Sequence, residues 1–154
     1  MAAQEPSNEE IVALLRSASP AEVAALRAAV HDVRRAAAAG PLFTWPDPGR
    51  DGTAEHPLQW PHPVYHPSVL SLDSALVAVH ACPIKNFDWR NWPGVPRLST
   101  PAAVSAAPLA DVARMVTAIL RAERFTDGII ARMLDEGILL AAADRILADL
   151  TAAP

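Results

Sequence analysis

The chain has 154 residues and a formal net charge of −4, with 17 acidic residues set against 12 arginines and one lysine. Such a length corresponds to about one domain, and the acidic balance provides no basic surface for holding a polynucleotide or an anionic membrane. We therefore expect neither nucleic-acid nor membrane partners. The single cysteine, Cys82, excludes an internal disulfide and a cysteine-rich zinc module.

The first residues lack the pattern of a secretion signal, because Glu5, Glu9 and Glu10 stand where positive charge would be needed. The longest uninterrupted apolar stretch covers residues 137–143, far short of the roughly 18 residues of a membrane span. We therefore expect a cytoplasmic protein.

Proline divides the chain more sharply than any motif does. Twelve of the 15 prolines lie between Pro41 and Pro108, together with all four tryptophans, the only tyrosine and four of the five histidines. Because proline fixes φ and has no N–H to donate, long helices are expected only at the two ends. The predicted fold is mainly α, a small single-domain helical bundle with an irregular middle rich in proline and aromatic residues. Its expected parts are a two-helix segment at 1–40, a loop or minor β-hairpin at 41–66, a helical core at 67–150 and a tail at 151–154.

The first predicted helix is short. Asn8 is expected to cap it, and Ile11, Leu14 and Leu15 share one side at the spacing of a helix. That side is expected to face the core.

The second predicted helix begins at the capping box Ser19-Pro20-Ala21-Glu22 and ends at Gly40. Its apolar positions form one narrow stripe made of Val23, Leu26, Val30, Val33 and Ala37. Such a stripe suits a single neighbour, either the rest of this domain or the same helix of a second chain. A homo-oligomer or a protein partner bound through the N-terminal helix is therefore one expectation.

The middle of the chain is expected to hold a short irregular hairpin between residues 42–45 and 58–65, restricted to an edge by the missing N–H donors of Pro61 and Pro63. A helix is then predicted from Pro67 to Cys82, ended by Pro83. The residues expected on its apolar side are Val69, Leu72, Leu76, Val79 and His80.

The C-terminal part has the most regular pattern. Thr100 and Pro101 indicate a brief helical turn. Thr126 is predicted to cap a later helix that Gly137 ends, and the last helix is expected over residues 138–150. Before Thr126, an apolar helical stripe consists of Leu109, Val112, Val116, Ile119 and Leu120.

Two strings of residues, taken together, resemble a known bacterial family. The first string is Tyr65 and Pro67, an apolar helix, and then Phe87-Asp88-Trp89-x-x-Trp92. The second is Leu109, Arg121-x-x-Arg124-Phe125-x-x-Gly128 and Gly137 before an apolar tail. In this order they resemble the family catalogued as domain of unknown function 6508, over roughly residues 58–150.

This resemblance implies no activity, ligand or catalytic residue. Members often have Cys and Glu after the Arg-Phe pair, whereas this chain has Thr126 and Asp127. A function that needs a thiol at that position is therefore not expected here.

One candidate site is the segment that contains Asp88, Trp89 and Trp92. A buried carboxylate between indoles would have a raised pKa suited to acid or base chemistry, and the two indoles with Tyr65 would suit a cation. The competing interpretation, which we favour, is that the aromatic side chains form part of the core and Asp88 accepts N–H groups there.

A second candidate site consists of Arg121, Arg124 and Thr126. Guanidinium groups beside the free N–H groups of a helix start would suit an anion such as a phosphate, a carboxylate or a nucleotide. The competing and favoured interpretation is that the arginines pair with neighbouring acids and Thr126 is only a cap.

Histidines and Cys82 suggest no strong metal site. His62 and His66 lie among prolines, and nothing in the sequence places them near His80 and Cys82, so we expect neither a metal nor a cofactor. A DNA-binding helix-turn-helix in residues 109–150 is disfavoured, because acids outnumber arginines there.

The sequence therefore favours a non-catalytic interaction or regulatory module. The alternative is a protein that binds a small ligand, an anionic metabolite or a nucleotide, or an enzyme. Its site would lie between residues 87–92 and 121–128.

Overall fold

The computed structural model describes residues 4–46, 53–55, 62–82 and 84–152, and within them the chain forms eight helices and one two-stranded sheet. The prediction of a mainly helical fold with one minor hairpin is confirmed. The helices are α1 (Asn8–Arg16), α2 (Pro20–Ala39), α3 (Pro67–Ala78), α4 (Gly94–Arg97), α5 (Pro101–Ala106), α6 (Leu109–Glu123), α7 (Ile129–Asp135) and α8 (Ile138–Ala152). The strands are β1 (Phe43–Thr44) and β2 (Val64–Tyr65).

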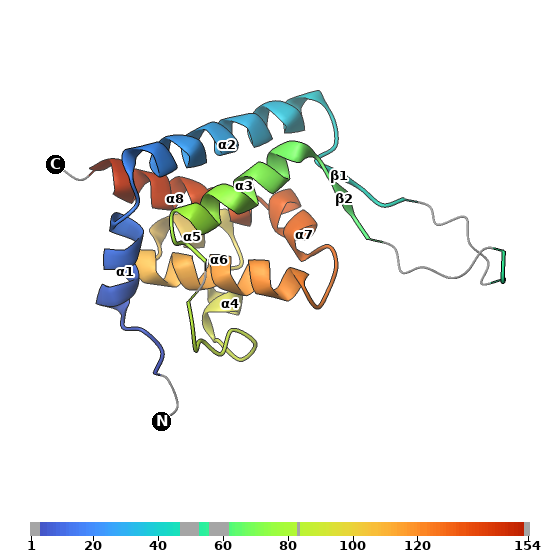
Figure 1. The fold of residues 1–154 in the computed structure, drawn as a ribbon. Coiled ribbons are helices and arrows are strands. Elements are labelled where there is room, and N and C mark those ends of the chain that lie inside the picture. Colours follow the sequence, from blue (N-terminus) through green and yellow to red (C-terminus); the bar gives the residue numbers. More distant parts are fainter. Residues whose placement is uncertain (1–3, 47–52, 56–61, 83, 153–154) are drawn as a thin grey trace.

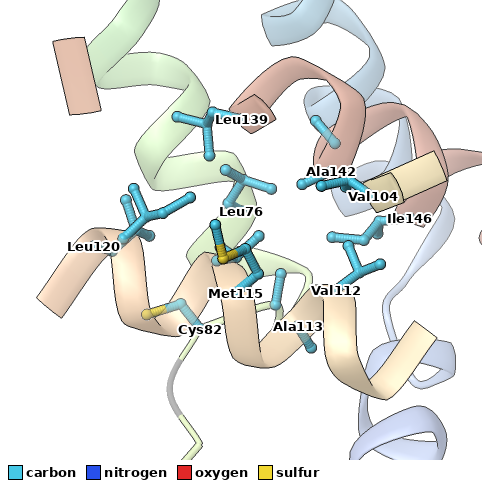
Figure 2. Close-up of a cluster of buried hydrophobic side chains, with 14 of the residues drawn as sticks. Leu76, Cys82, Val104, Val112, Ala113, Met115, Leu120, Leu139, Ala142 and Ile146 are labelled. Atoms are coloured by element: carbon cyan, nitrogen blue, oxygen red, sulfur yellow. The ribbon is translucent and has the colours of Figure 1, made fainter. Parts of the chain in front are cut away.

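Helix α6 lies at the centre of the bundle and is buried on most of its circumference, with ten of its residues in the core. Helices α1, α4, α7 and α8 contact it, and α2 lies across α3 and α8 (Figure 1). Figure 2 shows Leu76 of α3, Val112 of α6 and Ile146 of α8 directed toward one another in the core. Because one cluster of buried side chains runs from Ile11 to Ile146, the two ends of the chain share a core.

The start of α1 differs from the prediction, because Ser7 and not Asn8 is its cap. The Ser7 hydroxyl accepts the backbone N–H of Glu10 at 3.2 Å, and the Glu10 carboxylate accepts the N–H of Ser7 at 2.7 Å. Leu14 was expected on the core side but is 46% exposed, whereas Leu15 is fully buried. The helix therefore meets the core along a narrower line than the three apolar positions suggested.

Helix α2 begins at the predicted capping box, in which Ser19 and Glu22 exchange hydrogen bonds. Of its apolar stripe, Leu26, Val30 and Val33 are buried, whereas Ala37 is exposed. Helix α2 packs against α3 and α8 of the same chain. The first of the two expected neighbours, the rest of the domain, thus occupies the stripe.

The predicted hairpin is present but short. Phe43 pairs with Tyr65 and Thr44 with Val64 in antiparallel register, and the two strands leave the helical body on one side (Figure 1). Of the region expected to pair, residues 58–61 lie outside the described residues.

Helix α3 ends at Ala78, so the prediction that it continues to Cys82 is wrong. His80 adopts a left-handed conformation with a φ of 61°, and the N–H groups of His80 and Ala81 donate back to Val77 and Leu76 at 3.0 Å each. These two bonds form a Schellman motif, which closes a helix by satisfying its last carbonyl groups. The motif also turns His80 partly into solvent, away from the core expected for it.

Helix α7 is bounded by two glycines in the left-handed region, Gly128 with a φ of 90° and Gly137 with a φ of 73°. Gly137 separates α7 from α8 as predicted. The prediction that Thr126 caps α7 is wrong, because Gly128 occupies the cap position and no side chain of the cap residue bonds there. None of the described helices combines the length and the apolar character that a membrane crossing needs.

We predict that Gly137→Ala lowers the free energy of unfolding by about 1–2 kcal/mol, because a Cβ is disfavoured at positive φ. The added atom would also lie 3.3 Å from the ring of Pro101. Gly40→Ala is the matched control, since the φ of Gly40 is 173° and nothing lies within 4 Å of an added Cβ. Urea denaturation measures both variants, and equal stabilities would contradict the prediction.

Candidate functional site

An apolar cavity of about 270 Å³ opens between α6, α7 and the segment that precedes α5. Aliphatic, methionine and indole side chains form most of its wall, and charged groups stand at only two lining positions, Arg132 and Glu136. Concave, mostly apolar sites with a few polar groups are typical of small-molecule binding. The lining residues are Trp89, Val95, Pro96, Ser99, Met115, Ala118, Ile119, Ala122, Ile129, Arg132, Met133, Glu136 and Ile138.

Helix α6 supplies one wall through Met115, Ala118, Ile119 and Ala122. These positions are separated by three, one and three residues, so they lie on one face of the helix. Two alanines on that face leave space that longer side chains would fill, which explains why a cavity opens at this point. Sequence alone indicated that Ile119 lies on an apolar stripe, but not that part of this face borders a cavity.

Helix α7 supplies the opposite wall through two neighbouring rows of side chains. Ile129 and Met133 form an apolar row, and Arg132 and Glu136 form a charged row, each with a spacing of four residues. Arg132 and Glu136 are exposed, whereas Met133 is buried. Helix α7 therefore presents apolar groups to the inside of the cavity and two opposite charges to its mouth.

Trp89 contributes an aromatic ring to the cavity wall. The indole stacks on the ring of Phe125 with a centroid distance of 5.9 Å and an interplanar angle of 22°. The guanidinium of Arg90 lies 5.2 Å from the Trp89 ring and 5.0 Å from the Phe125 ring, within cation–π range of both. Trp89 is partly buried and packs against the core on one side, as the favoured interpretation expected, while Phe125, which is 68% exposed, covers it from the surface.

The position of α7 depends on the carboxylate of Glu123, the last residue of α6. One oxygen accepts the backbone N–H of Ile130 at 2.8 Å, and the other accepts that of Gly128 at 3.2 Å. The N–H groups at the start of a helix have no partner within the helix, and a carboxylate also suits the positive end of its dipole. Glu123 thus takes the capping role expected for Thr126.

The hairpin is attached to the same corner through Tyr65. Its hydroxyl donates to Glu123 at 2.7 Å and accepts the backbone N–H of Ala131 at 3.3 Å. Partial burial, together with the adjacent Glu123 carboxylate, raises the pKa of Tyr65 above its ordinary value. Trp45 packs on Gly128, where a Cβ would lie 2.7 Å from the indole. Tyr65 therefore connects the hairpin to α7. It does not line the cavity that Trp89 borders, so the structure does not show the cation pocket considered for Tyr65 and the two tryptophans.

A second hollow, of about 370 Å³, lies between α3 and the C-terminal part of α6 and holds two of the predicted residues, Arg121 and Arg124. Arg121 donates to the backbone carbonyl of Ile84 at 2.7 Å, so it holds the segment after α3 and makes no ion pair with an acid among the described residues. Arg124 is exposed. The remaining lining residues of this hollow are Asp73, Val77, Cys82, Leu120, Glu123 and Ile130.

The titratable groups of the second hollow are mixed in charge. Burial raises the pKa of Asp73, an effect that the nearby charge of Arg124 opposes. Burial also raises the pKa of Cys82, which keeps its thiol protonated and weakly nucleophilic. The hollow contains two guanidinium groups, those of Arg121 and Arg124, and two carboxylates, those of Asp73 and Glu123. Glu123 is already engaged in capping α7.

The structure contradicts the interpretation of Asp88 as a buried acid. Asp88 is exposed and accepts the side-chain N–H of Asn91 at 2.9 Å. Trp92 is half-buried and meets Phe87 edge to face, with a centroid distance of 5.6 Å. Thr126 is exposed at the α6–α7 corner. Of the six predicted site residues, only Trp89 lines the apolar cavity, while Arg121 and Arg124 line the second hollow.

Arg132 and Glu136 are the site residues that the sequence analysis did not identify. The available signal was the Arg-x-x-x-Glu spacing on a short helix between Gly128 and Gly137. That spacing is common on solvated helices, and only the packing of α7 on α6 shows that the two charges border a cavity.

The histidines take structural roles in the described part of the chain. His62 contacts Asp127 at 2.8 Å, and the ring of His66 caps α3 by accepting the N–H of Ser68 at 3.2 Å. Within the described residues, no group of three or more His, Cys, Asp or Glu side chains is placed to hold a metal ion.

We predict that Glu123→Gln lowers the free energy of unfolding by about 1–2 kcal/mol, because charge-assisted hydrogen bonds to two backbone N–H groups and to Tyr65 become weaker. Asp127→Asn is the matched control, since it removes a carboxylate from the same corner that only pairs with an exposed histidine. Urea denaturation checks both variants, and a loss no greater for Glu123→Gln than for Asp127→Asn would refute the capping role.

Comparison with known proteins gives one match. The sequence pattern of the Family of unknown function (DUF6508) matches residues 10–150, and neither a curated protein nor a solved structure matches the chain. The match begins 48 residues before the expected start at residue 58, and this longer extent agrees with the packing of α1 on α6 and of α2 on α3 and α8. The chain belongs to the Family of unknown function (DUF6508), with nearly its whole length inside the family pattern.

Proposed function

We propose that this protein is a non-catalytic binding module that holds a small, mainly apolar molecule in the cavity between α6 and α7. The observation that carries the proposal is the composition of the cavity wall, which is apolar apart from Ser99 and the two charges at the mouth. Transfer of apolar surface from water into such a cavity contributes roughly 25 cal/mol per Å². The proposal includes a cytoplasmic location, with which the free thiol of Cys82 is compatible.

The side chains of the wall suit this role. Met115 and Met133 have flexible, polarisable side chains that adjust to ligands of different shape. Trp89 adds a flat ring on which an aromatic or planar group can stack. This cavity replaces the expected site between residues 87–92 and 121–128, since only Trp89 and Ala122 from those two segments line it.

We predict that Ala118→Leu abolishes binding of small apolar molecules, because the added carbons occupy cavity space. The measurement is a ligand-induced shift of the melting temperature with indole, phenol, 3-methylbutanol and apolar amino acids as probes, since a ligand that binds the folded state stabilises it. Ala122→Leu, which fills the same cavity from another position, is a second blocking variant. Ala24→Leu, on the exposed side of α2, is the control.

The expected result is a shift in the parent protein and in Ala24→Leu that is lost in both blocking variants. If no probe raises the melting temperature of the parent protein, or if Ala118→Leu and Ala122→Leu retain the full shift, the proposed cavity is not a binding site.

A second candidate function is self-association along α2, the protein partnership expected for the N-terminal helix. The observation that favours it is a shallow solvent-facing hollow between α2 and α3, beside which Leu70 is 56% exposed. Small side chains line this hollow, and they allow a further helix to approach closely. They are Ala25, Ala28, Ala29, Ser71, Ser74, Ala75 and Ala78.

We predict for this second candidate that light scattering at micromolar concentration gives the mass of two chains, and that Leu70→Glu restores the mass of one, because a charge opposes burial of the hollow. Leu14→Glu, which alters an exposed leucine on α1, should remain dimeric. A single-chain mass for the parent protein at every concentration would exclude self-association through this surface.

A further inference from the structure

The mouth of the apolar cavity carries two opposite charges that have no partner in the part of the chain that the structure describes. Arg132 lies on α7, and Glu136, four residues later, is the C-cap of the same helix. Among the described residues, neither side chain makes a hydrogen bond or an ion pair, with each other or with a third group. Side chains four residues apart on a helix are neighbours, so the guanidinium and the carboxylate stand side by side and both remain available.

Several other arginines of this protein form ion pairs, whereas the exposed Arg27 and Arg124, like Arg132, form none among the described residues. Arg16 pairs with Asp149 at 2.9 Å, Arg34 pairs with Asp144, and Arg114 pairs with Glu5 at 2.9 Å. The order of charges on α7 explains part of the contrast, because an acid placed four residues before a base pairs better on a helix than the reverse order found here. Arg132 and Glu136 differ from the other unpaired charges because they line the apolar cavity.

The size of the cavity limits what can enter it. Its volume of about 270 Å³ lies just below the range of roughly 300–1,000 Å³ that is typical of sites for drug-sized ligands. At about 30 Å³ for each water in the liquid, it equals the space of about nine waters. A branched aliphatic or aromatic side chain fits within such a space, whereas a whole nucleotide exceeds it.

The signs of the two charges limit the head group of the ligand. A ligand with only a carboxylate would pair with Arg132 but would be repelled by Glu136, and a ligand with only an ammonium group would meet the reverse arrangement. A head group that carries both charges on one carbon satisfies both side chains at once. Extending the proposed function, on which this inference rests, we propose that the ligand is an α-amino acid with an apolar side chain.

In this arrangement the carboxylate of the amino acid pairs with Arg132 and its ammonium group pairs with Glu136, while the side chain enters between α6 and α7. The ring of Trp89 and the thioether of Met133 contact the side chain inside the cavity. Apolar burial then contributes most of the affinity, and the two charges at the mouth select the head group.

Isothermal titration calorimetry tests the proposal with matched ligands that share one side chain. These are L-leucine, L-leucinamide, which lacks the carboxylate, 4-methylpentanoate, which lacks the ammonium group, and 3-methylbutanol, which lacks both charges. A second set built on L-phenylalanine covers an aromatic side chain. We expect each free amino acid to bind about two- to fivefold more tightly than its amide or its acid, the range for single exposed ion pairs.

Two charge-removing variants assign the roles of the side chains. Arg132→Gln should weaken binding of L-leucine and 4-methylpentanoate by about two- to fivefold but strengthen that of L-leucinamide, because the guanidinium that repels its ammonium group is removed. Glu136→Gln should weaken binding of L-leucine and L-leucinamide but strengthen that of 4-methylpentanoate, because the carboxylate that repels it is removed. Arg27→Gln on α2 and Asp135→Asn, beside the site but not lining it, are the controls and should bind every ligand as the parent protein does.

The outcomes separate this inference from the function on which it rests. If 3-methylbutanol binds as tightly as L-leucine and Ala118→Leu abolishes both, the cavity is a binding site but the assignment of an amino acid is wrong. If Arg132→Gln and Glu136→Gln weaken all ligands equally, the charges do not read the head group and the assignment is likewise wrong. If no ligand binds at all, the proposed function fails together with the inference.

Discussion

The arrangement of this protein depends on one carboxylate, that of Glu123. It stands at the C-terminal end of its own helix, where the helix dipole disfavours a negative charge, yet it accepts N–H groups from Gly128 and Ile130 at the start of the next helix. The same group accepts the hydroxyl of Tyr65 from the hairpin. Two consecutive helices and a hairpin strand 58 residues earlier therefore meet at one charge. The orientation of α7, which brings Arg132 to the cavity, follows from it.

The abundance of alanine explains how a cavity opens in a bundle this small. Alanine promotes helix formation but contributes little apolar area, so helices such as α2 and α8 approach one another closely while part of α6 lacks bulk. At Ala118 and Ala122 the facing helix is the short α7, whose longer residues do not fill the space completely. Trp89 borders this space and is held from outside by Phe125 and Arg90. The site thus combines a flexible apolar interior with a fixed aromatic edge.

The candidate site was predictable only in part. Trp89 stood out because of its place in a dense aromatic string, and it does line the cavity. Asp88, one residue earlier, was considered either as a buried acid between indoles or, as we favoured, as an acceptor of N–H groups beside the core aromatic residues. It is exposed and accepts the side-chain N–H of Asn91. Arg121 was a candidate for an anion site, with pairing to neighbouring acids as the favoured interpretation, yet its guanidinium bonds to the carbonyl of Ile84. The free charges at the cavity are those of Arg132 and Glu136, on a helix whose exposed face resembles any solvated surface in the sequence.

The sequence by itself determined the elements that depend on local interactions. The capping box before α2, the glycine between α7 and α8 and the apolar stripe of α6 were all readable, because hydrogen bonds and side-chain spacing within a few residues decide them. The tertiary structure alone decided which side chain caps α7, where the cavity opens and which charges remain unpaired. Those features depend on contacts between elements, such as that of Tyr65 with Glu123. No local sequence pattern predicts such a contact, because its geometry arises only when the helices pack.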